Sequence, residues 1–170
     1  DAVEVGADRV FQRSNQERGR LAVRRRSKIA AHRHALRVAD SPRLAAARGV
    51  SLQTELADVY AWQWDENRFD VIAAIFIQFA SSSQRSALHE LIQRAVKPGG
   101  LLLLQGYTPK QLEFGTGGPS NIDNLYTAED LRRDFAGMKI LHLCEHESSI
   151  DEGPGHNGMS ALVDLVARKV

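Results

Sequence analysis

Four polar side chains after residue 70 could act on a bound small molecule: Gln78, Tyr107, Glu152 and His156. His156 lies between glycines in a turn-rich segment, where a histidine can serve as a general base or bind an oxyanion. The alternative is an ordinary histidine of a surface loop. Gln78 can hydrogen-bond a substrate but cannot take its proton at neutral pH. We select Tyr107, His156 and Gln78 as the candidate catalytic residues.

Metal and nucleophile chemistry have little support in the sequence. His142 and His146 would share a face of a strand, but two histidines without a third ligand make a poor metal site. Cys144 is the only cysteine, which excludes an internal disulfide and a cysteine-based zinc cluster. No Ser-His-Asp set is visible. We therefore expect no metal and a reduced thiol.

The elements that must position these residues begin with a βα unit. Residues 50–56 alternate apolar and polar, which predicts a short strand, and residues 71–79 form an apolar run typical of a parallel strand. The serines at 81–83 can cap the helix that follows, and Lys-Pro-Gly-Gly at 97–100 ends it. A second buried strand begins at 101–104. Strand, helix, turn and strand in this order predict a parallel pair and an α/β fold.

The rest of the chain predicts a long connection, a helix and a hairpin. The connection over residues 107–126 has Gly-Thr-Gly-Gly-Pro at 115–119, and a connection of this length is usually functional or disordered. Thr127 can cap a helix. Two late strands, at 139–145 and 160–168, flank a turn-rich segment and predict an antiparallel hairpin at the edge of the sheet.

Topology predicts where the candidate residues meet. The loop after the leucine strand leaves the carboxyl edge of the sheet, and the late hairpin returns to that edge. We therefore expect Tyr107, the 115–119 loop and His156 to converge there and form the acceptor pocket, as a lid that excludes water.

Composition and charge narrow the classes of function. The 170 residues are 43% hydrophobic and 25% charged, which is ordinary for one globular domain. The longest apolar run, 71–80, is too short to span a bilayer, so we expect a cytoplasmic protein with no membrane contact. Residues 1–50 hold eleven arginines and one lysine against five acidic residues. This basic front lacks interleaved aromatic residues and any nucleic-acid motif, so we favour a solvated surface over nucleic-acid binding.

Several stretches of the second half resemble a known family when they are taken in order. They are ARGVSLQTELAD, FDVIAAIF, LIQRAVKPGGLLLLQGYTPKQLEFGTGGP, LYTAEDLRRDF and DEGPGHNGMSALVDLVARK, which cover roughly residues 46–169. Together they are similar to the class I S-adenosylmethionine-dependent methyltransferases, and more narrowly to the small bacterial branch that includes the tellurite-resistance methyltransferases. KPGG alone is shared widely in that class; GYTP, QL-x-x-GTGGP and EG-x-x-H-x-G in that order are more specific.

The resemblance implies a set of cofactor-binding residues at the carboxyl ends of the strands. Asp58 resembles the acid that contacts the adenine amino group, with Val59 beside it; the alternative for Asp58 is a surface acid that caps the next turn. Ile75 and Phe76 resemble the motif that lines the methionine part of the cofactor, and plain core packing is the alternative. Asp40 resembles the acid that holds the ribose hydroxyls.

The front of the chain departs from the family. The first strand should end in an acid and a glycine-rich turn, but the nearest candidate, residues 3–8 (Val-Glu-Val-Gly-Ala-Asp), keeps one glycine of that pattern. The helix signature at 41–49 is about half as long as the family implies, and no convincing second strand precedes Asp40. A shifted reading frame and divergence both explain such a front. We expect residues 1–45 to be degenerate or irregular and residues 46–170 to form the methyltransferase-like core.

The expected architecture is a Rossmann-like, mostly parallel sheet with an antiparallel C-terminal hairpin and an incomplete front. The resemblance implies methyl transfer from S-adenosylmethionine to a small molecule, impaired if the missing glycine loop weakens cofactor binding. The alternative is a catalytically inactive domain of the same fold that binds or dimerises. A monomer or a homodimer fits either function.

Overall fold

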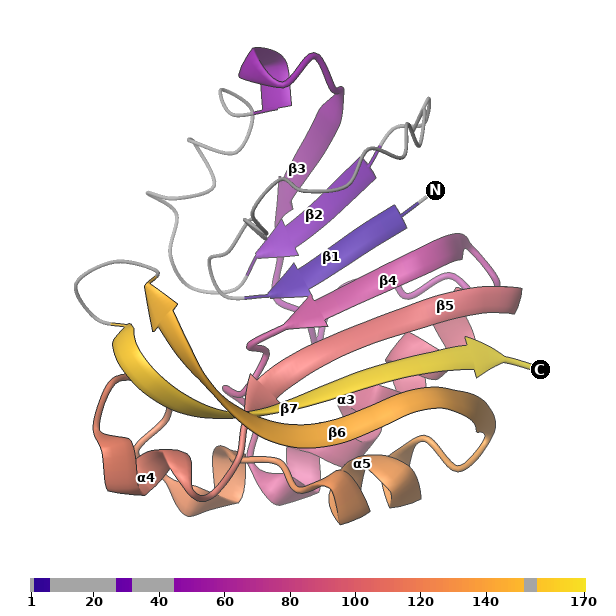
Figure 1. The fold of residues 1–170 in the computed structure, drawn as a ribbon. Helices are drawn as coiled ribbons and strands as arrows, with labels where there is room; N and C mark the ends of the chain where they lie inside the picture. The colour runs from indigo at the N-terminus through magenta and orange to yellow at the C-terminus, as the bar shows by residue number, and fades with distance from the viewer. Residues whose placement is uncertain (1, 7–26, 32–44, 152–155) are drawn as a thin grey trace.

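The computed structural model describes residues 2–6, 27–31, 45–151 and 156–170, which contribute to a seven-stranded sheet in the order β3-β2-β1-β4-β5-β7-β6 (Figure 1). The strands are β1 (Ala2–Gly6), β2 (Ser27–Ala31), β3 (Leu52–Leu56), β4 (Phe69–Ile75), β5 (Val96–Tyr107), β6 (Met138–Asp151) and β7 (Asn157–Lys169). Strands β1 to β5 are mutually parallel where they pair, whereas β7 runs antiparallel to both β5 and β6. This arrangement confirms the predicted α/β class and its antiparallel hairpin.

The predicted βα unit is present, with its cap and its turn. Helix α3 (Ser82–Ala95) joins β4 to β5. The side-chain oxygen of Gln84 accepts hydrogen bonds from the Ser81 N–H at 3.4 Å and from the Ser81 hydroxyl at 3.2 Å. After the helix, Gly99 has a φ of 78°, and a Cβ on Gly100 would lie 2.8 Å from the Asp70 carbonyl oxygen. The Lys-Pro-Gly-Gly turn therefore needs both glycines.

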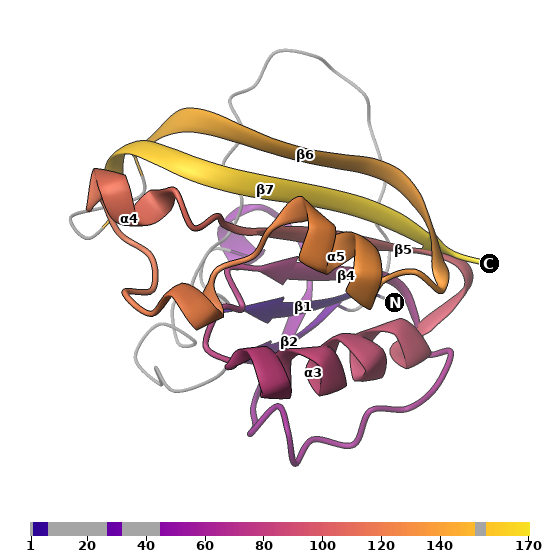
Figure 2. The ribbon, with the colours of Figure 1, turned by 90° about the horizontal axis from the view of Figure 1, so that it is seen from below.

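The connection from β5 to β6 contains short helices. They are α4 (Gln111–Phe114), the 3-10 helix η1 (Ile122–Asn124) and α5 (Ala128–Asp134). Thr127 caps α5 as predicted: its hydroxyl accepts from the Asp130 N–H at 3.1 Å, while the Asp130 carboxylate accepts from the Thr127 N–H at 3.3 Å. Figure 2 shows α3 and α5 on the same face of the sheet.

The main core lies between that face and the two helices. The largest fully buried apolar side chains come from the strands, from both helices and from the segment before α5: Phe69, Ile72, Leu88, Ile92, Leu102, Tyr126, Leu131, Phe135 and Leu165. Each buried aliphatic side chain of this size contributes about 1.5–3 kcal/mol to folding. The core therefore fixes β4, β5 and β7 as a rigid platform for the residues at their ends.

The front of the chain differs from the sequence-based expectation at two segments. β1 lies in the middle of the sheet, paired with both β2 and β4, and β2 pairs with β3. The expectation that no convincing second strand precedes Asp40 is therefore wrong, because β2 (Ser27–Ala31) lies before it, and the weak candidate for a first strand at residues 3–8 overlaps β1 (Ala2–Gly6). Both strands have five residues, and their extended backbone is imposed by parallel pairing with neighbouring strands. Segments this short show no clear alternation of apolar and polar residues. The division at residue 45 stays a prediction.

Within the described residues, no helix has the length and apolar composition that crossing a membrane requires.

Candidate functional site

The carboxyl ends of the parallel strands define one edge of the sheet. Gly6 at the end of β1 pairs with Ile75 of β4, and Ile75 pairs with Gln105 of β5. The strand order changes direction between β1 and β4, because β2 and β3 lie on one side of β1 and β4 and β5 lie on the other. Open α/β sheets bind ligands at such a position.

Phe76 has an unusual backbone at this position. Its φ is 52°, a left-handed conformation that is rare and strained for a bulky residue. The Phe76 N–H donates to the Gln105 carbonyl at 2.8 Å, which holds the turn after β4. The ring of half-buried Phe76 lies 4.7 Å from the ring of Tyr107, between centroids. Strain of this kind concentrates at functional sites.

Tyr107 and His156 meet beside Phe76, as the topology predicts. The Tyr107 hydroxyl lies 3.1 Å from His156 Nδ1, and the two rings are nearly parallel with centroids 6.4 Å apart. The 115–119 loop reaches the same place, because a Cβ on Gly118 would lie 2.9 Å from Tyr107 Cδ2. The structure thus brings together a phenol, an imidazole and two aromatic faces at the carboxyl edge. Their catalytic role stays a prediction.

Gln78 supports Tyr107 from within the protein. Its Nε2 donates to the carbonyl oxygens of Tyr107 at 2.8 Å and Asn124 at 3.0 Å, and its Oε1 accepts from the Tyr107 N–H at 2.6 Å. A Cβ on Gly106 would lie 3.0 Å from Gln78 Cδ, so the glycine admits this close contact. The side chain of Gln78 is 5% exposed. Its amide groups thus face backbone, which favours a positioning role over contact with substrate.

Asp58 and Val59 follow the carboxyl end of β3, the outermost strand on the β1 side of the sheet, with Ala57 between the strand and Asp58. The Asp58 carboxylate is exposed and accepts from the Tyr60 N–H at 3.0 Å, which caps the next turn. Val59 is 3% exposed within the main core, and its carbonyl accepts from the Trp64 indole at 2.9 Å. The position of Asp58 leaves its carboxylate open to a ligand, whereas the side chain of Val59 faces the core.

Three candidate residues remain: Ile75, Asp40 and Glu152. Ile75 is half-buried at the end of β4. Asp40 and Glu152 lie outside the described residues, although β2 ends at Ala31 and so Asp40 does not directly follow it.

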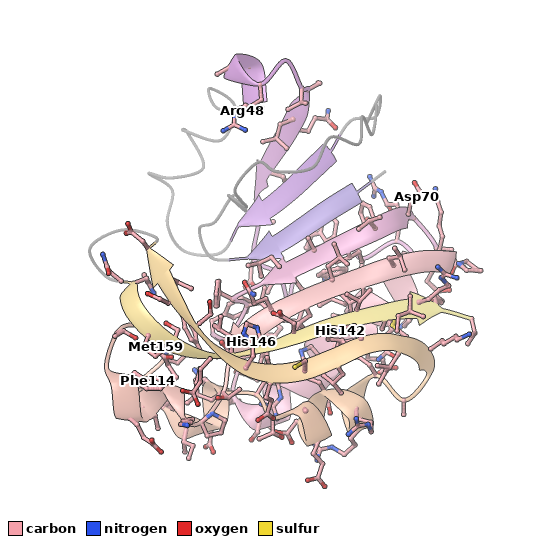
Figure 3. The ribbon with its side chains drawn as sticks, in the orientation of Figure 1. Arg48, Asp70, Phe114, His142, His146 and Met159 are labelled. Atoms are coloured by element: carbon pink, nitrogen blue, oxygen red, sulfur yellow. The ribbon has the colours of Figure 1, made fainter. Side chains whose placement is uncertain are left out.

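The histidines of β6 are separated along the strand, as Figure 3 shows for His142 and His146. His146 Nε2 lies 3.0 Å from the Asp164 carboxylate, which also accepts from the Gln105 amide at 2.8 Å. In the part of the chain that the structure describes, no group of three or more His, Cys, Asp or Glu residues is arranged to hold a metal.

A buried charged cluster behind the site was missed by the sequence analysis. We define it as Arg85, His89 and Asp134: His89 Nδ1 lies 2.9 Å from the Asp134 carboxylate, and Arg85 Nη1 donates to the Leu125 carbonyl at 3.1 Å. Burial lowers the pKa of His89; the hydrogen bond to Asp134 opposes this effect and the charge of Arg85 reinforces it. Arg85 and His89 share the α3 face that carries Leu88, and this polar pair within an apolar stripe was the available signal.

Comparison with known proteins places the fold. The sequence matches no protein-family model and no curated protein. The structure is similar to TehB from Haemophilus influenzae, with a TM-score of 0.65 and 14% identity over 85% of this chain and 50% of that one. It is also similar to a SAM-dependent methyltransferase from Methanosarcina mazei, with a TM-score of 0.61 and 13% identity over 85% of this chain and 82% of that one. The chain has the methyltransferase fold.

The covered length and a neighbour with a different activity show that this similarity concerns the fold. The chain spans about half of the length of the Haemophilus protein. The [4+2]-cyclase SpnF is similar as well, with a TM-score of 0.63 and 18% identity over 99% of this chain and 74% of that one. The fold that the resemblance implied is confirmed, and function must be argued from the site.

Proposed function

We propose that the chain performs S-adenosylmethionine-dependent methyl transfer to a small-molecule acceptor. The observation that carries this proposal is the meeting of Phe76, Tyr107 and His156 where the strand order reverses, within the methyltransferase fold. The proposal includes a cytoplasmic location, a monomer or homodimer, and no nucleic-acid partner.

The described residues fit two parts of the cofactor. Ile75 and strained Phe76 offer an apolar, aromatic wall for its methionine part, and exposed Asp58 offers a carboxylate for the adenine amino group. When bound, the cofactor supplies an electrophilic methyl group, so the protein needs mainly to align the acceptor and exclude water. Tyr107 and His156 orient the acceptor through a hydroxyl and an imidazole, and His156 is the group that can accept its proton.

Two other positions fit the cofactor poorly. Gly6 ends β1, but Ala-Asp-Arg follows it and no second glycine completes the loop. His-Arg-His follows β2 in the sequence, so the residues directly after this strand are not acidic, and Asp40, the candidate for the ribose hydroxyls, lies outside the described residues. Each lost backbone donor removes about 0.5–1.5 kcal/mol, and several together weaken binding by a factor of about ten to several hundred. The proposed activity is therefore impaired in this chain.

A second candidate function is a non-catalytic domain that binds a partner or dimerises. It is supported by the same two sequence departures at β1 and β2, and by the general observation that one fold can serve several functions. This candidate needs the sheet and its core but no cofactor.

Calorimetry with S-adenosylhomocysteine separates the two candidates. We expect binding that is weak but measurable, and weaker still in Asp58→Asn, because that substitution removes the carboxylate at the adenine position. Gln53→Glu is the matched control, since Gln53 is exposed on β3, away from the carboxyl edge. Low-micromolar affinity would contradict the impairment, and no binding at millimolar ligand would favour the non-catalytic domain.

A further inference from the structure

A second buried glutamine, Gln111, resembles Gln78 in that its amide hydrogen-bonds to distant parts of the chain. Its side chain is 1% exposed at the start of α4. Nε2 donates to the Thr116 hydroxyl oxygen and to the Gly117 carbonyl, both at 3.0 Å, and Oε1 accepts from the Ala161 N–H at 2.8 Å. One side chain thus joins the 115–119 loop to β7.

Thr116 extends this connection. Its hydroxyl accepts from Gln111 and donates to the Met159 carbonyl at 2.6 Å. Its methyl group lies against Gly158, where a Cβ would be 2.9 Å from Thr116 Cγ2. Figure 3 shows Phe114 of α4 and Met159 of β7 at the same end of the molecule. The start of β7 is therefore held at two nearby backbone groups: Thr116 binds the Met159 carbonyl, and Gln111 binds the Ala161 N–H.

These contacts fix both partners of the Tyr107–His156 pair. His156 directly precedes β7, which begins at Asn157. Gln111 and Thr116 bind the backbone at the start of this strand, and the same backbone determines the position of the His156 imidazole. On the other side, the loop that Gln111 holds presses Gly118 against the Tyr107 ring. The Thr108 N–H also donates to the Ala161 carbonyl at 3.0 Å. Ala161 is the residue whose N–H donates to Gln111 Oε1, so both of its backbone groups are paired here.

We propose that Gln111 is a positioning residue that sets the contact between the Tyr107 hydroxyl and His156 Nδ1. Its side-chain hydrogen bonds go to the loop and to β7, and it acts through these two segments. Its consequence for catalysis rests on the proposed methyl transfer, whereas its effect on the Tyr107–His156 contact does not. A buried amide suits this role because its two donors and its acceptor satisfy three backbone or hydroxyl groups at fixed angles.

The test is the NMR signal of the His156 imidazole, assigned with His156→Gln. Tyr107→Phe removes the hydroxyl and defines the signal of a broken contact. In Gln111→Glu the carboxylate still accepts from Ala161 but loses both donors and faces the Gly117 carbonyl. We expect its His156 signal to move to the position found in Tyr107→Phe. Thr116→Val, which removes only the hydroxyl link, should shift the signal in the same direction.

Gln93→Glu is the matched control for this experiment. Gln93 makes two hydrogen bonds from α3, to the carbonyls of His89 and Asp134, and takes no part in the contacts of Tyr107 or His156 described above. Its His156 signal should stay at the wild-type position. A wild-type signal in folded Gln111→Glu and Thr116→Val would overturn the proposal, whatever their activity.

Activity adds a separate readout. If the wild-type chain transfers methyl groups, Gln111→Glu should lower kcat by up to about 100-fold with unchanged affinity for S-adenosylhomocysteine, since misplacement by 1 Å costs that much. If the wild-type chain binds no S-adenosylhomocysteine, the proposed function fails, and the imidazole signal still decides the role of Gln111.

Discussion

The glutamine contacts at the carboxyl edge and the charged cluster between α3 and α5 are both buried, but they differ in how completely their polar atoms are paired. Gln78 and Gln111 pair all their amide groups, mostly with backbone. In the charged cluster, Arg85 Nε and His89 Nε2 have no hydrogen-bond partner. A neutral, satisfied contact holds one geometry at any pH, whereas a charged cluster depends on the protonation of its members.

The two regions also share a segment, residues 124–126. Gln78 donates to the Asn124 carbonyl, Arg85 donates to the Leu125 carbonyl, and the Tyr126 N–H donates to the Tyr107 carbonyl at 3.0 Å. The charged cluster therefore stabilises the segment on which the glutamine contacts depend. Substitutions in each region should separate stability from geometry.

The largest effect is expected for Arg85→Met. The substitution keeps the aliphatic stem but leaves the Leu125 carbonyl without its donor. It also removes the buried guanidinium that lies 3.7 Å from Asp134, which keeps only the exposed Arg133 as a nearby arginine, at 3.6 Å. Removing one partner of a buried ion pair costs about 3–5 kcal/mol. Chemical denaturation should show this loss, and Arg94→Met, at an exposed arginine of the same helix, should change the free energy of unfolding little. Equal stability of the two variants would contradict the importance of the cluster.

Gln78→Leu should destabilise the chain less, by about 2–3 kcal/mol, because the buried N–H of Tyr107 loses its acceptor and the Asn124 carbonyl its donor. It should also disturb the Tyr107–His156 contact, which Arg85→Met leaves nearer to its native geometry. Denaturation combined with the His156 imidazole signal measures both effects. Gln53→Leu, on an exposed position of β3, is the control. A native imidazole signal in folded Gln78→Leu would argue against its positioning role.

Local sequence signals were sufficient for most of the fold after residue 50. Ser81 and Thr127 mark helix starts, as the structure shows. Gly99 and Gly100 lie in the irregular first part of β5, which begins at Val96, five residues earlier than the predicted start at 101. β2 was missed, and β1 was found only as a weak candidate at residues 3–8, because short strands are specified by their neighbours in the sheet. Their pairing with β4 and β3 joins residues that are far apart in the sequence.

The site was predictable only as far as topology determines it. The order of strands and loops was enough to bring Tyr107 and His156 to one edge. The role of Gln78 depends on a hydrogen bond across 29 positions, and that of Gln111 on one across 50. Such contacts join a side chain to distant backbone and leave no periodic pattern.

Gly118→Ala should cost about 1–2 kcal/mol, since Gly118 has a φ of 86° where an L-residue is strained. The added methyl group would also meet the Tyr107 ring at 2.9 Å and displace it. Gly137→Ala is the matched control, because a Cβ there meets only Gln93 Oε1, at an ordinary 3.5 Å. The free energy of unfolding and the imidazole signal should change in Gly118→Ala alone. Tolerance of the methyl group in both readouts would show that the loop is not held against Tyr107.

The smallest effect is the pH dependence that His89 gives to the charged cluster. Arg85, Tyr126 and the α5 residues Asp134 and Phe135 surround the imidazole, and Asp130 lies beyond Arg85. Burial lowers the pKa of His89, so the unfolded chain binds more protons below the ordinary value of 6.5. The free energy of unfolding should therefore be unaffected by His89 above about pH 6.5. It should decrease as the pH falls below that value, by no more than about 1.4 kcal/mol per pH unit for this one group.

Denaturation between pH 8 and pH 5 measures this slope, and His89→Gln should flatten it because glutamine does not titrate. The Tyr107–His156 region provides the contrast: the amide contacts of Gln78 and Gln111 carry no charge, so Thr116→Val, which introduces no titratable group into this region, should keep the wild-type slope of stability that His89 produces. A slope that persists in His89→Gln would assign the pH dependence to another group. A free energy of unfolding that increases as the pH falls would mean that Asp134 holds the imidazole in its charged form. The charged cluster would then consist of two cations and one carboxylate.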